Sequence, residues 1–174
     1  MKTNRSLLAM AALCASLALH NNARGAEGAL NDDDQKFVKM AAQSSMAEVQ
    51  FGMLGARKAA PEEVKALAEK IQQDHTAMNE ELKQLAQAKN VMLSQVTDPD
   101  ATKDMKDLEN KATGGDFAKA WLQEMDERHG KAITSFDAAI ANSKDADVKA
   151  WAEKHLPHLK AHHEQIKALR QKYP

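Results

Sequence analysis

Histidine is the residue type in this sequence whose number and spacing could do the most chemistry. Imidazole nitrogens bind zinc, copper, nickel and iron, and their charge changes near neutral pH. Four of the seven histidines fall in the segment EKHLPHLKAHHEQ. This segment could form a metal site, a pH-sensitive patch or the polar side of a helix. The four are His155, His158, His162 and His163, while His75 and His129 lie apart from them, near Asp74 and Asp126.

The N-terminal segment has the pattern of a cleavable secretory signal peptide. Lys2 and Arg5 precede an apolar run over residues 7–19, which is too short to span a membrane as a helix. We expect cleavage after Gly25, so that residues 1–25 are the signal peptide and residues 26–174 form one domain. Cys14 suggests lipidation as an alternative, but Leu13 is bulky for the small-residue position that such processing prefers. The expected location is the periplasm or an association with the outer membrane.

Composition excludes several functional classes. Cleavage removes the only cysteine, so zinc-thiolate and iron-sulfur sites are excluded. The chain has 24 basic and 25 acidic residues, and cleavage removes three bases and no acids. The remaining 21 and 25 give a net charge of −4, which argues against nucleic acid as a partner. The segment TGGD lacks the strand and lysine of a phosphate-binding loop, and no strained turn activates Ser44 or Ser45 as a nucleophile.

From Asp32 onward, apolar residues recur every three to four positions, which predicts an all-α fold. NDDD begins one helix, Pro61 separates it from the next, and NSKDAD is a tight turn between the last two. The predicted long helices cover residues 32–58, 61–90, 116–141 and 145–172, with a short helix over 101–111 in the long connection between the second and third. Four helices of this length predict a four-helix bundle.

Several ionisable residues fall inside the apolar stripes when each residue advances by about 100°. All of them lie near the middle of their helices, so we expect them to converge in one central layer. Burial of unpaired charges is costly, so such groups either pair with one another or bind a metal. The inward set is Glu48, His75, His129, His155 and His162, with Asp74, Asp126 and His158 at the edges of the stripes.

Two interpretations of this layer remain open. In one, the histidines and Glu48 form a paired polar layer that fixes the helix register. In the other, they bind zinc, copper, nickel or iron, since calcium would require more carboxylates. Met78 and Met125 each lie about one turn from a histidine and add thioethers that suit copper(I), although methionines at this spacing also fill cores.

Three motifs resemble the exported bacterial ferritin-like family called domain of unknown function 4142 (DUF4142), over residues 31–169. The first, D..F...AA....E...G, is matched with slight spacing tolerance by Asp34, Phe37, Ala41, Ala42, Glu48 and Gly52. The second, a VK..A segment ending in DH, is matched by Val64, Lys65, Ala68, Asp74 and His75. The third, LP.L..H, is matched by Leu156, Pro157, Leu159 and His162.

The resemblance implies a ferritin-like four-helix bundle of the cell envelope and favours Glu48, His75, His129 and His162 as the principal inward set. Di-iron ferritins use Glu-x-x-His motifs, but this chain has Gln72 before His75. This argues against ferroxidase chemistry and against an enzyme. We therefore expect an exported protein that binds a transition metal for storage, buffering or sensing. The alternative is a structural or stress-related envelope protein without metal. The partners that the sequence leaves open are a metal ion, an envelope protein and a second copy of the chain.

Overall fold

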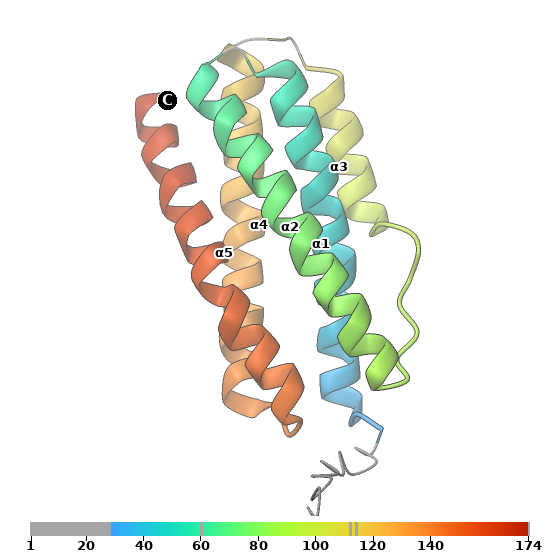
Figure 1. Cartoon of the computed structure of the whole chain (residues 1–174). Helices are drawn as coiled ribbons and strands as arrows, with labels where there is room; N and C mark the ends of the chain where they lie inside the picture. Colours follow the sequence, from blue (N-terminus) through green and yellow to red (C-terminus); the bar gives the residue numbers. More distant parts are fainter. Residues whose placement is uncertain (1–28, 60, 112, 114, 174) are drawn as a thin grey trace, which may run out of the picture.

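Five helices and no β-strand make up the part of the chain that the structure describes, which is residues 29–59, 61–111, 113 and 115–173 of a computed structural model (Figure 1). The predicted signal peptide lies outside these residues. The helices are α1 (Asp32–Lys58), α2 (Glu62–Ala88), α3 (Pro99–Glu109), α4 (Gly115–Asn142) and α5 (Ala146–Lys172). Each predicted helix is present, with ends that differ by at most two residues.

Side-chain caps explain where several helices begin. Asn31 accepts a hydrogen bond from the backbone N–H of Asp34 at 2.9 Å, which satisfies one free donor of α1. Asp98 and Asp145 cap α3 and α5 in the same way. The second helix ends two residues earlier than predicted because Asn90 adopts a left-handed conformation with φ of 56°. Asparagine tolerates this conformation, which commonly terminates helices.

The helices form a ferritin-like four-helix bundle, which confirms the predicted fold. Figure 1 shows that α1 and α2 join at one end of the bundle, and that α4 and α5 join at the opposite end. The long connection after α2 returns along the bundle and includes α3, so α4 runs parallel to α2. The central layer still forms because its residues lie near mid-height on each of the four long helices. The position of the turns is therefore unimportant for their convergence.

Two glycines let α1 lie close to its neighbours. A Cβ atom on Gly52 would lie 2.8 Å from the backbone oxygen of Ala68, and one on Gly55 would lie 2.7 Å from Trp121. The Trp121 indole is fully buried and donates a hydrogen bond to the carbonyl of Phe51 at 2.8 Å. This close packing fixes α1 against α2 and α4, and with it the position of the α1 side chains in the centre.

The core consists of two apolar clusters with a polar layer between them. One cluster includes Ile71, Met125 and Ile166, and the other includes Met78 and Leu159. On α2, α4 and α5, the chain passes from one cluster to the other across a single buried histidine. Those histidines are His75, His129 and His162.

Candidate metal centre

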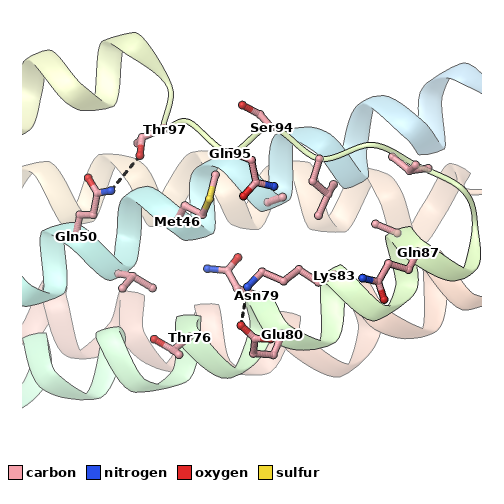
Figure 2. A pocket seen from close by; sticks show the side chains of 15 residues that line it. Met46, Gln50, Thr76, Asn79, Glu80, Lys83, Gln87, Ser94, Gln95 and Thr97 are labelled. Carbon is pink, nitrogen blue, oxygen red and sulfur yellow. Dashed lines mark hydrogen bonds and ion pairs between the residues drawn. The ribbon is translucent and has the colours of Figure 1, made fainter.

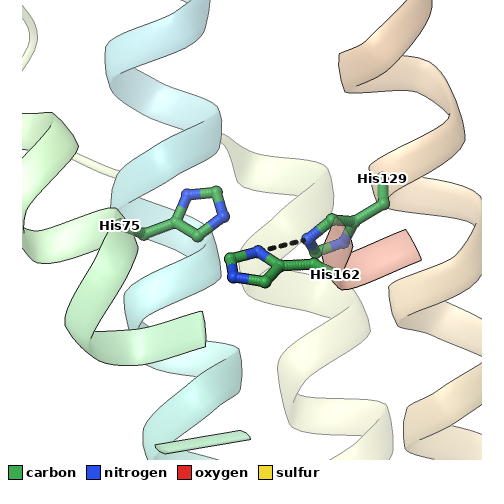
Figure 3. Close-up of side chains that lie close together, drawn as sticks. All are labelled: His75, His129 and His162. Carbon is green, nitrogen blue, oxygen red and sulfur yellow. Dashed lines mark hydrogen bonds between the residues drawn. The ribbon is translucent and has the colours of Figure 1, made fainter. Parts of the chain in front are cut away.

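Three histidines from three helices meet in the polar layer between the two apolar clusters (Figure 3). His75 comes from α2, His129 from α4 and His162 from α5, and each is at most 3% exposed. One ring nitrogen of each can be chosen so that the three lie within 4.8 Å of one another. His129 Nε2 and His162 Nδ1 are 3.4 Å apart. The packing of α2, α4 and α5 thus brings three residues that are far apart in the sequence into one cluster of imidazoles.

A hydrogen-bond acceptor holds the outer nitrogen of His162. Its Nε2 atom lies 2.7 Å from Asp74 Oδ2, and a carboxylate oxygen accepts, so the ring carries its proton on Nε2. The Nδ1 atom of His162 then presents a lone pair to His129. Lys70 also binds Asp74, at 2.8 Å, which keeps the carboxylate in place.

The other two rings are oriented by acceptors of the same kind. His129 Nδ1 lies 3.0 Å from the carbonyl oxygen of Met125 and donates to it. The Ser45 hydroxyl donates to the His75 carbonyl at 3.2 Å and accepts from His75 Nδ1 at 3.1 Å. Both rings therefore carry the proton on Nδ1 and have a lone pair on Nε2. His75 Nε2 has no hydrogen-bond partner among the described residues.

Burial keeps these three imidazoles neutral. It is the main cause that lowers the pKa of His129 from 6.5 to about 3, and the adjacent His162 adds to the effect. Burial likewise lowers the pKa of His75 well below its usual value. For His162, burial outweighs the opposing influence of Asp74, so its pKa is also lowered. Neutral imidazole is the form that binds metal ions, so the site needs no deprotonation at neutral pH.

Glu48 lies against this cluster, behind the ring of His129. Its Oε2 atom is 3.8 Å from His129 Nδ1, on the side of the ring opposite the nitrogen that faces His162. The carboxyl group is 3% exposed, and Oε2 has no hydrogen-bond partner among the described residues. Burial raises its pKa to about 8, against the opposing charge of Arg128. The sequence placed Glu48 in the ligand set, and the structure places it where it can act on a ligand's outer nitrogen.

His155 and His158 lie outside the cluster. His155 is buried on α5, and its Nε2 binds Glu81 at 2.9 Å. Its ring also contacts Trp151, with 4.9 Å between the ring centroids. His158 is exposed, and its ring centroid lies 6.1 Å from that of His155. His155 therefore pairs with α2, His158 lies at the surface, and neither belongs to the converging set.

Asp126 also turns away from the cluster. Its Oδ1 atom lies 2.8 Å from His163 Nε2, and its other oxygen accepts from Arg170. This arrangement joins α4 to α5 on the side of the bundle. Asp74, by contrast, reaches the cluster through His162.

The sequence analysis named Ser45 only in excluding it as a nucleophile. Its hydroxyl in fact orients His75. The signal that could have identified it is its position one helical turn before Glu48, on the same inward face of α1.

Several cavities border α1, and two of them also have lining residues on α2. One has a volume of 280 Å³, and its lining includes Ser45, His75 and Met78. The other has a volume of 580 Å³ and lies between α1, α2 and the connection before α3 (Figure 2). A hydrogen bond of 3.1 Å between Gln50 and Thr97 crosses its edge. None of the three central histidines lines the second cavity, so only the first one touches the candidate site.

The family model described as "Domain of unknown function (DUF4142)" matches residues 20–169. The chain belongs to the DUF4142 family. No curated protein matches it. Within the described residues, none of the helices combines the length and the apolar character needed to cross a membrane.

Solved structures with the same fold share little sequence with this chain. A DUF305 fragment from Deinococcus radiodurans has a TM-score of 0.73 and 10% identity, covering 83% of this chain and 99% of its own. A DUF305 protein from Streptomyces coelicolor, titled as secreted, has a TM-score of 0.69 and 18% identity, with coverages of 81% and 92%. CopM in its Cu(II)-bound form has a TM-score of 0.64 and 19% identity, with coverages of 81% and 97%. At these identities, the likeness shows the fold.

Proposed function

We propose that this DUF4142 protein is an exported metal-binding protein that holds one transition-metal ion between His75, His129 and His162. Its role is storage, buffering or sensing of the ion rather than catalysis. The buried cluster has three imidazoles and a single carboxyl group, Glu48, which lies behind one of the rings. Carboxylate-rich di-iron sites that activate oxygen are built differently.

The observation that carries the proposal is the direction of the three lone pairs. Each ring donates its outer N–H to an acceptor, namely Ser45, the Met125 carbonyl or Asp74. The lone pairs of His129 Nε2 and His162 Nδ1 consequently face each other over 3.4 Å. Neither nitrogen carries a proton to donate, so the two neutral rings cannot form a hydrogen bond there. A cation between them removes the conflict. Acceptors behind ligating histidines are the usual support of such metal sites.

The spacing of the nitrogens supports a small ion. Around a tetrahedral zinc or copper centre with metal-nitrogen distances of about 2.0 Å, ligand nitrogens are about 3.3 Å apart. The separation of His129 Nε2 and His162 Nδ1 is 3.4 Å. The third nitrogen lies within 4.8 Å and needs a modest inward movement of the His75 ring.

Copper is the first candidate ion, with zinc, nickel and iron as the others that nitrogen ligands accept. The support for copper is the similarity in fold to CopM, whose structure is described as Cu(II)-bound. Export is supported by the signal-peptide pattern of residues 1–25 and by the similarity in fold to a protein described as secreted. The periplasm is the compartment we propose.

The alternative is an envelope interaction protein with an internally paired polar layer. Two buried atoms that have no partner in the described part of the chain argue against it. His75 Nε2 and Glu48 Oε2 are buried without hydrogen-bond partners among the described residues. A layer whose purpose is only to fix helix register would pair them, since each unsatisfied buried group costs about 1–3 kcal/mol. Metal binding explains the unpartnered nitrogen of His75.

The test is metal-dependent stability of the untagged protein over residues 26–174 after dialysis against a chelator. An ion that binds only the native state, at about 100 times its dissociation constant, adds about 2.7 kcal/mol to the free energy of unfolding. The matched variants are His162→Ala and His163→Ala, which alter adjacent residues of α5. We expect the first to abolish the response to copper or zinc and the second to retain it. The proposal fails if copper, zinc, nickel, iron and manganese all leave the melting midpoint unchanged, or if both variants lose the response equally.

A further inference from the structure

The 280 Å³ cavity connects exposed residues with the candidate metal centre. It lies between α1, α3 and α4, and its floor includes His75 and Leu159. The side chain of His75 is buried, and its Nε2 atom has no partner among the described residues. A ligand that enters this cavity therefore contacts His75, which is a member of the central cluster.

Two methionines line the cavity at different depths. Met40 is 40% exposed, and its sulfur lies 3.9 Å from the hydroxyl of Ser135. Met78 is 2% exposed and follows His75 by three residues, which puts the two on the same side of α2. Thioether sulfur is a soft ligand that selects monovalent copper over harder ions.

The charged residues of the cavity favour a cation. Four acids line it, Asp98, Asp100, Asp104 and Glu124, against two bases, Arg128 and Lys131. The guanidinium of Arg128 lies 3.2 Å from Asp104 and 2.7 Å from Glu124, so its charge is compensated within the lining. It also lies over the ring of Phe51 at 4.2 Å.

We propose that this cavity is the entry route by which a soft monovalent cation of the cuprous class reaches the three histidines, with Met40 and then Met78 as thioether ligands on the way to His75. The inference rests on the proposed function and adds the class of ion and the path. No redox step is involved, because the ion keeps its single charge throughout. The methionines act on the rate of loading, whereas the histidines determine the affinity.

The test compares loading rates of two probe ions in the full mature protein. Silver(I) represents the cuprous class without changing its oxidation state, and zinc(II) is the harder ion. Protein and ion are mixed rapidly and quenched with excess chelator, and the metal content of the desalted protein is measured against time. We expect Met40→Leu and Met78→Leu each to slow silver loading by about tenfold, which corresponds to about 1.4 kcal/mol in the barrier. Zinc loading and the final stoichiometry of both ions should be unchanged.

Met46→Leu is the matched control, because Met46 lies on the same helix but lines the other cavity. Wild-type silver rates in Met40→Leu, or equal slowing of silver and zinc, would overturn the route. Met40 is exposed, so its variant decides the question even if Met78→Leu does not fold. If the wild-type protein binds neither ion at equilibrium, the route is overturned, and the metal-dependent stability test above decides whether the proposed function fails with it. Binding of both ions with unchanged rates in the variants overturns the route alone.

Discussion

His162 and His163 are neighbours in the sequence, and both place Nε2 against an aspartate, yet their environments differ completely. His162 is 1% exposed, binds Asp74 at 2.7 Å and turns its other nitrogen toward His129. His163 is half-buried at the side of the bundle and binds Asp126 at 2.8 Å. The aspartate of His163 also accepts from Arg170, which compensates its charge.

The comparison shows that a histidine-carboxylate pair alone does not indicate a site. The aspartate of the outer pair is also in an exposed ion pair with Arg170, and exposed ion pairs contribute little to stability. The inner pair fixes a tautomer whose remaining lone pair faces two further imidazoles. Unlike the outer pair, the inner region buries two polar atoms without hydrogen-bond partners among the described residues, His75 Nε2 and Glu48 Oε2, and this has consequences for stability that can be measured.

The largest effect is expected at Glu48, the carboxyl group of the inner region. Its pKa is raised from 4.5 to about 8, so at neutral pH the folded state binds a proton that the unfolded state releases. Between these two values, stability falls as the pH rises. Glu48→Gln removes this penalty, and we expect about 3 kcal/mol of added stability near pH 7 in the metal-free protein. The gain should disappear below about pH 4, where both states are protonated.

Urea denaturation of the wild type and the variant at the two pH values measures this effect. Asp126→Asn is the control from the outer region, and it should cost less than about 1 kcal/mol at either pH. If Glu48→Gln gave no gain at neutral pH, Glu48 would be as well compensated as Asp126. The distinction between the two regions would then be lost.

The sequence predicted the fold well because the helical period and the end signals agree along the chain. NDDD and Pro61 mark their helix boundaries to within a residue. Four long helices of similar length predict a four-helix bundle. The direction of the third long helix could not be derived, since a connection of residues 89–114 reaches either end of the bundle. The exposure of Met40 could not be derived either, because a helical period identifies a face, whereas a cavity between elements decides exposure.

The convergence of His75, His129 and His162 was also predictable, since residues at mid-height on facing stripes must meet. The helical period of the sequence could not show which nitrogen of each histidine ring faces inward. That choice depends on acceptors behind each ring, such as Ser45 and the Met125 carbonyl, and a backbone acceptor leaves no sequence signal. For the same reason, Glu48 was correctly expected to be buried, but its place behind His129 was not foreseen.

A second effect, of intermediate size, is acid destabilisation by the inner histidines. The pKa of His129 is about 3 in the fold against 6.5 ordinarily, so its contribution is present above pH 6.5 and is lost as the pH falls below it. The loss amounts to about 2 kcal/mol by about pH 5. Because Glu48 titrates with the opposite sign in this range, the measurement belongs in the Glu48→Gln background.

In that background, we expect His129→Gln to reduce the loss of stability between about pH 7 and about pH 5, and His163→Gln to leave it unchanged. Urea denaturation at the two pH values measures both variants. Equal pH dependence in the two would mean that burial does not separate the inner histidine from the outer one.

The smallest effect, and the sharpest comparison, concerns the two aspartates. Asp74→Asn replaces the carboxylate that holds His162 with its Nδ1 lone pair inward by a neutral amide, which is a weaker acceptor, and Asp126→Asn makes the same change behind His163. Loss of such a support costs about 10- to 100-fold in metal affinity. Competition titration against a chromogenic chelator should therefore show weaker binding of copper or zinc in Asp74→Asn only. Equal affinities in the two variants would show that the ion does not depend on His162, whereas a selective loss would assign Asp74 as the residue that positions this ligand.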